Sequence, residues 1–492
     1  MVNNKTTLMA YGDFPQGSPL PYSVLSTQFI NAAYPDKKLQ IRNGGFGSDA
    51  AAHPSNPNQF YVLTDRGPNA DFEGCLGSGK LFLLPDYTPR IGLFELQANG
   101  DILKIKEILL KNTQGTAISG LPNPKALGGT HEIPYDVDGQ LMTMNPSLPF
   151  DEITNPIKTD INGLDPEGLA ALTDGSFWIS DEYGPHLVHY NGDGVEIGRI
   201  NPFATDARNT VVAHGQTILL PAEFAKRRAN RGMESLTITP DQTTLVGVME
   251  SSLDNPDTSG RASNLARIVT INLVSGQIAQ YLYPLNHPKH VTSGIAALSN
   301  HEFYLIEHDR KLPLQEASAQ KHIYKINIAE ATDIESITDK NSSDTNATDK
   351  NSTEKYHLKQ DSALGLTING QALEPFIASS EGSWQTLATM NIIPVDKKLV
   401  VDVLKTVDYP HDKLEGLWLR QDGSLGLLND DDFAMTDAMT DLSMTAVHLS
   451  ALSHPNNPNN LSTLNNLVEQ KYLDRHKTIE DANRLYIVMP TE

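Results

Sequence analysis

One unit recurs along this chain and limits its fold more than any other feature. Most copies have an acid near the start, and each has a short apolar stretch, a turn of polar residues, a second apolar stretch and then further acids. Two short apolar runs around such a turn predict a β-hairpin. The five copies cover residues 47–66, 166–182, 233–250, 293–307 and 414–432.

The two ends of each hairpin carry acids that the fold would bring together. In the second copy, Glu167 opens the first strand, Asp174-Gly175 forms the turn, and Asp181-Glu182 follows the second strand. The opening and closing acids therefore lie at one end of the hairpin. In a β-propeller the inner strands of the blades line a central channel. We therefore expect an all-β propeller in which about ten acidic positions reach one face of that channel.

Segments between the hairpins have the apolar content of outer strands. They include residues 188–200, 266–273, 322–327 and 484–488. The five copies predict about six or seven four-stranded blades, with one or two degenerate, around a central acidic channel. We expect residues 1–492 to form this single domain.

Three segments depart from the repeat. Residues 128–145 are a candidate for a degenerate blade. Residues 332–355 are polar and repetitive, which predicts a flexible low-complexity insertion at the surface. Residues 221–230 predict a short helix that has proline at an early position.

Composition excludes several classes of partner. The formal net charge is −22, so the field of the protein repels nucleic acid and anionic membranes. This charge suits divalent cations, although solubility alone also explains it.

Cys75 is the only cysteine, which excludes a disulfide framework and a thiolate metal cluster. No apolar run is long enough to span a bilayer. The first eleven residues lack a signal core, so the chain is either cytosolic or an exported protein without its signal peptide.

The convergence of acids predicts a metal site. A lone acid at a strand end is usually a turn cap or a solvated residue. Like charges gathered in one channel instead raise one another's pKa unless a cation lies among them. An all-oxygen site suits Ca²⁺, Mg²⁺ or Mn²⁺. The expected ring consists of Glu167, Asp181, Glu182, Glu234, Glu250, Glu307, Glu415 and Asp430.

The fourth copy differs from the others. It has Gly294 where other copies have an acid, and His290 lies four residues earlier. A histidine in place of a carboxylate would favour Mn²⁺ or Zn²⁺. The alternative is an ordinary loop histidine.

Arginines lie beside these acids. Arg66 follows Asp65, Arg231 precedes Glu234, and Arg310 follows Glu307 closely. These arginines either neutralise the acid ring through ion pairs or, together with a metal, bind a phosphate or phosphonate through their bidentate forks. Hydrolysis would then require a metal-bound water of lowered pKa and a positioned acid–base group.

Several motifs resemble the bacterial phytase-like proteins known as the "esterase-like activity of phytase" family. The motifs are Asp165-Pro166-Glu167-Gly168-Leu169, residues 178–185, residues 230–236, residues 306–310 and Leu414-Glu415-Gly416-Leu417 with residues 429–433. They occur in family order between residues 43 and 433. The resemblance implies a secreted or periplasmic propeller with metal-dependent phosphoesterase activity.

The resemblance, with the analogy to a propeller phosphotriesterase, also implies site residues. Metals, one or two ions of Ca²⁺ or Mn²⁺ with Zn²⁺ less suitable, are expected on Glu167, Glu234, His290, Glu307 and Glu415, with Glu250, Asp49 and Asp430 as further candidates. Arg66, Arg231, Arg310 and Asp181 are expected to take part in catalysis.

The leading hypothesis is a monomeric, metal-dependent phosphoric ester hydrolase that acts on a small phosphodiester, phosphotriester or phytate-like substrate. One alternative is a metal-dependent lactonase or carboxylesterase. Another is a non-catalytic propeller that metal ions stabilise and that binds a partner.

Overall fold

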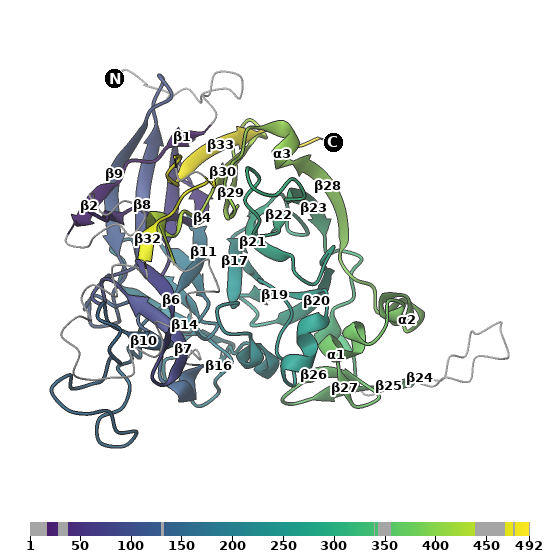
Figure 1. Ribbon diagram of the computed structural model, residues 1–492. Helices are drawn as coiled ribbons and strands as arrows, with labels where there is room; N and C mark the ends of the chain where they lie inside the picture. The colour runs from purple at the N-terminus through teal and green to yellow at the C-terminus, as the bar shows by residue number, and fades with distance from the viewer. Residues whose placement is uncertain are drawn as a thin grey trace.

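The computed structural model describes residues 17–27, 38–128, 132–338, 340–342, 356–437, 468–475 and 478–491. This part of the chain is almost entirely β-structure (Figure 1). Its only α-helices are the short α1 (Leu373–Ala378), α2 (Ser383–Thr389) and α3 (Val403–Thr406). None of the helices in these ranges is both long and apolar enough to cross a membrane.

Five four-stranded sheets form the body of the molecule, and four of them use strands in chain order. The first has β4 (Phe46–Ala52), β5 (Gln59–Thr64), β8 (Arg90–Leu96) and β9 (Ile102–Leu109). The second has β11 (Pro166–Ala171), β12 (Phe177–Asp181), β13 (Leu187–Tyr190) and β14 (Glu196–Ile200). The third has β17 (Met233–Ile238), β18 (Thr244–Met249), β19 (Leu265–Asn272) and β20 (Ile278–Pro284). The fourth has β21 (Val291–Ala297), β22 (Glu302–His308), β23 (Lys321–Asn327) and β28 (Asp396–Asp402).

The fifth sheet joins the two ends of the described chain. It contains β29 (Gly416–Leu419), β30 (Leu425–Leu428) and β33 (Arg484–Val488), and β1 (Ser18–Pro19) adds its outer edge. The pairing of β1 with β33 is antiparallel. This pairing ties the N-terminal part of the described chain to the last sheet.

The first strands of these sheets follow one another in a cycle. β4 contacts β11, β11 contacts β17, β17 contacts β21, β21 contacts β29, and β29 contacts β4. The five predicted hairpins are therefore confirmed, and each supplies the first two strands of one sheet. The arrangement is propeller-like. The described residues give five sheets in the cycle, so they do not confirm the expected six or seven blades.

The core lies between neighbouring sheets. Tyr61 and Leu63 of the first sheet pack in one cluster with Leu169 and Ile179 of the second. Corresponding clusters join the second to the third sheet, the third to the fourth, the fourth to the fifth, and the fifth to the first. The second strand of each sheet is covered by both neighbouring clusters and is buried along most of its length.

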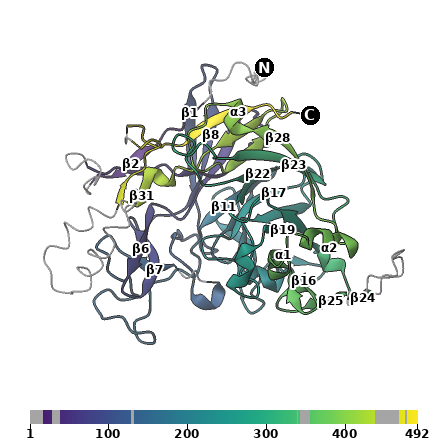
Figure 2. The same ribbon diagram turned by 45° about the vertical axis from the view of Figure 1, so that its right-hand side comes forward.

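Smaller elements surround this body. β6 (Asn69–Gly74) and β7 (Gly77–Phe82) form a hairpin to which β10 (Ile133–Tyr135) adds in parallel. The described strand within residues 128–145, β10, joins this hairpin and none of the five sheets, so the degenerate blade stays a prediction. A sheet of β24 (Lys340–Ser342), β25 (Tyr356–Asp361), β26 (Gly365–Ile368) and β27 (Gln371–Ala372) lies on the opposite side of the molecule (Figures 1 and 2). The remaining strand pairs are β2 (Ser23–Ser26) with β3 (Ile41–Asn43), β15 (Val212–Ala213) with β16 (Gln216–Thr217), and β31 (Met435–Asp437) with β32 (Val468–Gln470).

The other predictions about single segments have mixed outcomes. The predicted outer strands are found as β13, β14, β19, β23 and β33. The predicted short helix is the 3₁₀ helix Ala222–Lys226. Within the predicted insertion, residues 339 and 343–355 lie outside the described residues. The part before them forms a 3₁₀ helix, Ile334–Ser336, in which Ile334 is buried.

Candidate functional site

Two glutamates lie at irregular positions within their first strands, and a third lies directly before its first strand. The register of β11 against β12 shifts between Pro166 and Gly168, which isolates Glu167. The register of β17 against β18 shifts in the same way around Glu234. The Glu415 amide donates to the Leu428 carbonyl at 3.0 Å, although Leu428 already pairs with Gly416. Extra residues of this kind re-aim a side chain at the end of a strand pair.

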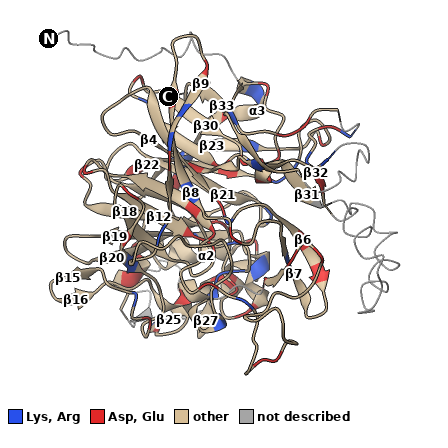
Figure 3. Ribbon diagram, turned by 90° about the vertical axis from the view of Figure 1, so that its left-hand side faces the viewer, with Lys and Arg blue, Asp and Glu red and all other residues tan. Residues whose placement is uncertain are grey.

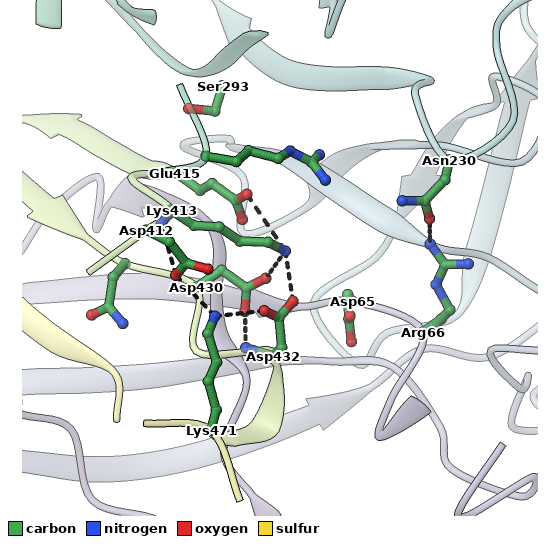
Figure 4. A network of polar contacts seen from close by, with 12 residues as sticks. Asp65, Arg66, Asn230, Ser293, Asp412, Lys413, Glu415, Asp430, Asp432 and Lys471 are labelled. Carbon is green, nitrogen blue, oxygen red and sulfur yellow. Dashed lines mark hydrogen bonds and ion pairs between the residues drawn. The ribbon is translucent and has the colours of Figure 1, made fainter. Parts of the chain in front are cut away.

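These glutamates line a cavity with an empty volume of about 370 Å³. Glutamate side chains from three sheets converge there, and basic side chains lie among them. Figure 4 shows how several of these residues lie close together. The lining consists of Asp65, Arg66, Asn69, Lys80, Glu167, Glu182, Asn230, Glu234, Arg310, Lys413, Glu415 and Asp432.

The carboxylates lie close enough to share a cation. One oxygen each of Glu167, Glu234 and Glu415 lie within 4.8 Å of one another. Glu182, Glu234 and Glu250 form a second such group, and Asp165, Glu167 and Glu182 form a third. All of these residues are buried, and the groups overlap through Glu167, Glu182 and Glu234.

Burial and mutual repulsion favour the protonated form of these acids. Burial is the main cause that raises the pKa of Glu182 to about 8, and the charges of Asp165 and Glu250 add to it. Burial also raises the pKa of Glu167 and Glu234 well above the usual value, with further contributions from neighbouring carboxylates. Without a cation, part of this cluster therefore holds protons at neutral pH.

A divalent cation fits this donor set. Oε2 of Glu234 and Oε2 of Glu250 are buried and have no hydrogen-bond partner. Unsatisfied buried carboxylate oxygens are costly unless a positive charge lies beside them. Because the donors are carboxylate oxygens, they suit hard ions such as Ca²⁺, Mg²⁺ or Mn²⁺.

The arginines predicted from the sequence lie beside the cluster in two different settings. Buried Arg66 contacts Glu132 and Asp165, and its Nη2 lies 3.3 Å from Glu182 Oε2. Arg310 Nη2 and Arg231 Nη1 instead bind Glu250 Oε1, at 2.5 and 3.1 Å. The Arg310 side chain is 36% exposed and lines the cavity, so its guanidinium can reach a ligand there.

A lysine network borders the other side of the cavity. Lys413 Nζ lies 2.7 Å from Asp430 Oδ2 and 2.6 Å from Asp432 Oδ1. Lys471, which follows β32, binds Asp432 Oδ2 at 2.6 Å and Asp412 Oδ1 at 2.9 Å (Figure 4). The predicted ligand Asp430 is thus paired with a lysine beside the cavity.

Two other predicted residues are engaged elsewhere. Asp49 Oδ2 accepts a hydrogen bond from the Leu169 amide at 2.7 Å, which joins the first sheet to the second. Asp181 Oδ1 accepts from the amides of Gly184 and His186 at 3.2 and 2.6 Å. Burial raises the pKa of Asp181 to about 6. Neither residue lines the cavity.

His290 and Glu307 form a separate cluster. Glu307 Oε1 lies 3.0 Å from His290 Nδ1, and Glu307 Oε2 accepts from Tyr283 and Lys397 at 2.8 Å each. Neither His290 nor Glu307 belongs to the cavity lining or to the carboxylate groups. The structure therefore does not bring these two predicted ligands to Glu167, Glu234 and Glu415.

Sequence reasoning missed several residues near the site. Asp65 lines the cavity from the end of the first hairpin, as Glu182 does from the second. His308, the last residue of β22, is buried, and its Nε2 has no partner. For Asp65 the repeat itself carried this signal, because this residue directly follows the strand pair. Asp165 and Glu132 lie outside the repeated units and had no such signal.

Fold and site together define an all-β protein with a propeller-like arrangement of sheets and a buried carboxylate cluster. The family model described as "Phytase-like: Esterase-like activity of phytase" matches residues 41–374. The chain belongs to this phytase-like family, which confirms the resemblance found in its motifs. Membership suggests a hydrolase of the phosphoesterase type.

Other comparisons are weaker. An "uncharacterized secreted protein" of Arthroderma benhamiae is 36% identical over 106 residues, which span 19% of this chain and 20% of the relative. Kuenenia stuttgartiensis hydrazine synthase has a TM-score of 0.26 and 10% identity, over 91% of this chain and 87% of that one. A GH43 glycoside hydrolase has a TM-score of 0.31 and 7% identity, over 84% of this chain and 49% of that one. These structural similarities support no inference about function.

Proposed function

We propose that this protein is a metal-dependent phosphoric ester hydrolase with its active site in the acidic cavity of a five-bladed propeller. The observation that carries the proposal is the convergence of Glu167 and Glu234, each from an irregular strand position, with Glu415 on one buried point. Arginines beside this point supply the groups that bind phosphoryl oxygens.

The cation would be held by carboxylates from three sheets. Glu167, Glu234 and Glu415 form one set of ligands, and Glu182 with Glu250 extends it toward a second position. Ca²⁺ or Mn²⁺ suits these oxygen donors better than Zn²⁺. Such an ion supplies a Lewis acid and lowers the pKa of a water that it binds.

The protein's own side chains bind and orient the ester. Arg310 faces the cavity and shares Glu250 with Arg231, so both guanidinium groups are held where negative charge develops on phosphorus oxygens. Arg66 has several acidic partners and serves to position Glu182. Glu182, with a pKa raised to about 8, can hold or release a proton near neutral pH.

Asp49, Asp181 and Asp430 have positioning roles in this proposal. Asp49 holds the first two sheets together, Asp181 fixes the loop that follows β12, and Asp430 holds Lys413 beside Glu415. We also propose that the protein acts outside the cytoplasm, in line with the secreted relative. We propose that it acts as a monomer.

The test is phosphate release from mono-, di- and triester model substrates by protein that has been stripped of metal and then reloaded with Ca²⁺ or Mn²⁺. We expect turnover only in the reloaded protein. Glu234→Gln should abolish it, whereas the exposed Glu330→Gln should not. Unchanged turnover after chelation, or in Glu234→Gln, would falsify the proposal. Turnover of lactones or carboxylic esters alone would move the assignment away from phosphorus.

A further inference from the structure

A second hollow adjoins the acidic cavity. It has an empty volume of about 980 Å³ and is bordered by the β6–β7 hairpin and by Glu132, Ala229 and Asn230. Lys80 and Asn230 line both spaces, so the two lie side by side. Figure 3 shows acidic and basic positions on and beside this hairpin. We call this second space the hairpin groove.

The charges of the hairpin groove are mainly negative. Asp71, Glu73 and Glu132 line it, and Lys80 is its only basic lining residue among those that the structure describes. Lys80 Nζ is bound by Asp71 Oδ1 at 2.5 Å. Arg66, which lines the adjoining cavity, is already paired with Glu132 and Asp165. Among the described residues, the groove therefore has no lysine or arginine without an acidic partner to offer to an anion.

The position of the hairpin groove defines what can occupy it. A phosphoryl group bound beside Arg310 would occupy the acidic cavity, and the rest of the ester would then extend into the adjoining space. We propose that the hairpin groove holds the leaving group of a small phosphate ester and that its carboxylates select leaving groups without further phosphates. Hydroxyl and ammonium groups can donate to Asp71 and Glu73, whereas additional phosphates are repelled.

This inference rests on the proposed function and narrows its substrate class. Phytate carries phosphates on every ring position that would enter the groove, so it should be a poor substrate despite the family's description. The preferred substrates are phosphate esters of polyols or amino alcohols. The hydrolytic step transfers the phosphoryl group to water, and the leaving oxygen departs into the groove and takes up a proton.

The test compares substrates on the metal-loaded, full-length protein. Phosphate release is measured for glycerol 3-phosphate, phosphoethanolamine and myo-inositol hexakisphosphate, with divalent cation in excess over the chelating capacity of each substrate. We expect kcat/KM for the first two to exceed that for the hexakisphosphate by at least about tenfold.

The matched variants are Glu73→Lys in the groove and Glu330→Lys at a distant exposed site, which make the same charge change. Glu73→Lys should raise kcat/KM for the hexakisphosphate relative to glycerol 3-phosphate by about fivefold, whereas Glu330→Lys should leave the ratio unchanged. Asp71→Asn, a smaller change on the same hairpin, should shift the ratio in the same direction.

The outcomes separate this inference from the proposed function. Hydrolysis that favours the hexakisphosphate, or a ratio that neither Glu73→Lys nor Asp71→Asn alters, would overturn the groove's role and leave the hydrolase intact. Absence of turnover with every ester in metal-loaded protein would overturn the hydrolase and the groove's role together.

Discussion

Glu167 and Glu234 occupy equivalent positions in neighbouring first strands, each at the residue where the register of its hairpin shifts. In a regular strand, successive side chains point to opposite faces of the sheet. The extra residue breaks this alternation and leaves one side chain free to point along the end of the strand pair. The same local irregularity in two sheets therefore brings two carboxylates to one point, where Glu415 joins them.

Removal of one central carboxylate should separate metal binding from folding. Glu234→Gln keeps the size of the side chain but removes a charge that Glu182, Glu250 and Glu415 repel. We expect metal affinity to fall by at least about 100-fold, while the metal-free protein melts at a higher temperature than the wild type. Calorimetric titration and thermal melting check the two effects. A metal-free variant that is less stable than the wild type would contradict the idea that repulsion among these carboxylates destabilises the metal-free protein.

The stability of the metal-free protein should fall as pH rises. The folded-state pKa of Glu182, about 8, lies above its ordinary value of 4.5. The folded protein therefore holds this proton more tightly than the unfolded chain. The contribution is fully present below about pH 4.5 and is lost as pH rises through about 8.

Glu167 and Glu234 act in the same direction, because burial and neighbouring carboxylates raise the pKa of each. We expect melting temperature in the presence of a chelator to drop by roughly 5 °C across this pH range. Saturating Ca²⁺ or Mn²⁺ should remove most of the drop, since the cation stabilises the ionised carboxylates. If the melting temperature in the presence of a chelator rises with pH, the raised pKa values of these glutamates are refuted.

The sequence predicted the hairpins well because their pattern is local. Two apolar runs around a polar turn were enough to locate β11 with β12 and β17 with β18. The choice between adjacent acids was harder, because a shift of one residue sends a side chain to the other face. Asp181 still pairs with Pro166 in the ladder, whereas Glu182, one residue later, lines the cavity.

In the fourth hairpin the ladder continues past the irregular position, through Glu307 and His308. Glu307 pairs with Thr292 inside the ladder and points to Tyr283 and Lys397. Asp165 and Glu132 reach the site from long connections between strands. Their positions in the sequence follow no repeat. Their contacts with Arg66 depend on the packing of separate sheets, which no local pattern encodes.

Arg310 and Arg66 should respond differently to substitution by alanine. Arg310→Ala leaves Glu250 with Arg231 as its partner, so the fold should persist while turnover falls by about 100-fold. Arg66→Ala would leave Glu132, Asp165 and Glu182 without their shared cation, at a cost of about 3–5 kcal/mol.

Thermal melting and steady-state kinetics on both variants distinguish these roles. Arg310→Lys is the matched control, because it keeps the charge and removes the fork; it should recover only part of the activity. A large loss of stability in Arg310→Ala, or a stable Arg66→Ala with unaltered kinetics, would contradict a ligand-binding role for Arg310 and a structural role for Arg66.

His290 provides a test of where the metal site ends. Its Nδ1 contacts Glu307 Oε1 at 3.0 Å, and Glu307 keeps Tyr283, Lys397 and the Asn286 amide as partners when the imidazole is removed. His290→Ala should therefore cost about 1 kcal/mol of stability, the net value of one hydrogen bond. Metal content should remain that of the wild type, because His290 lies outside the carboxylate groups around Glu234. Elemental analysis of His290→Ala beside Glu234→Gln decides the matter: loss of metal from both variants would show that the histidine is a ligand, and that the site extends to the fourth sheet.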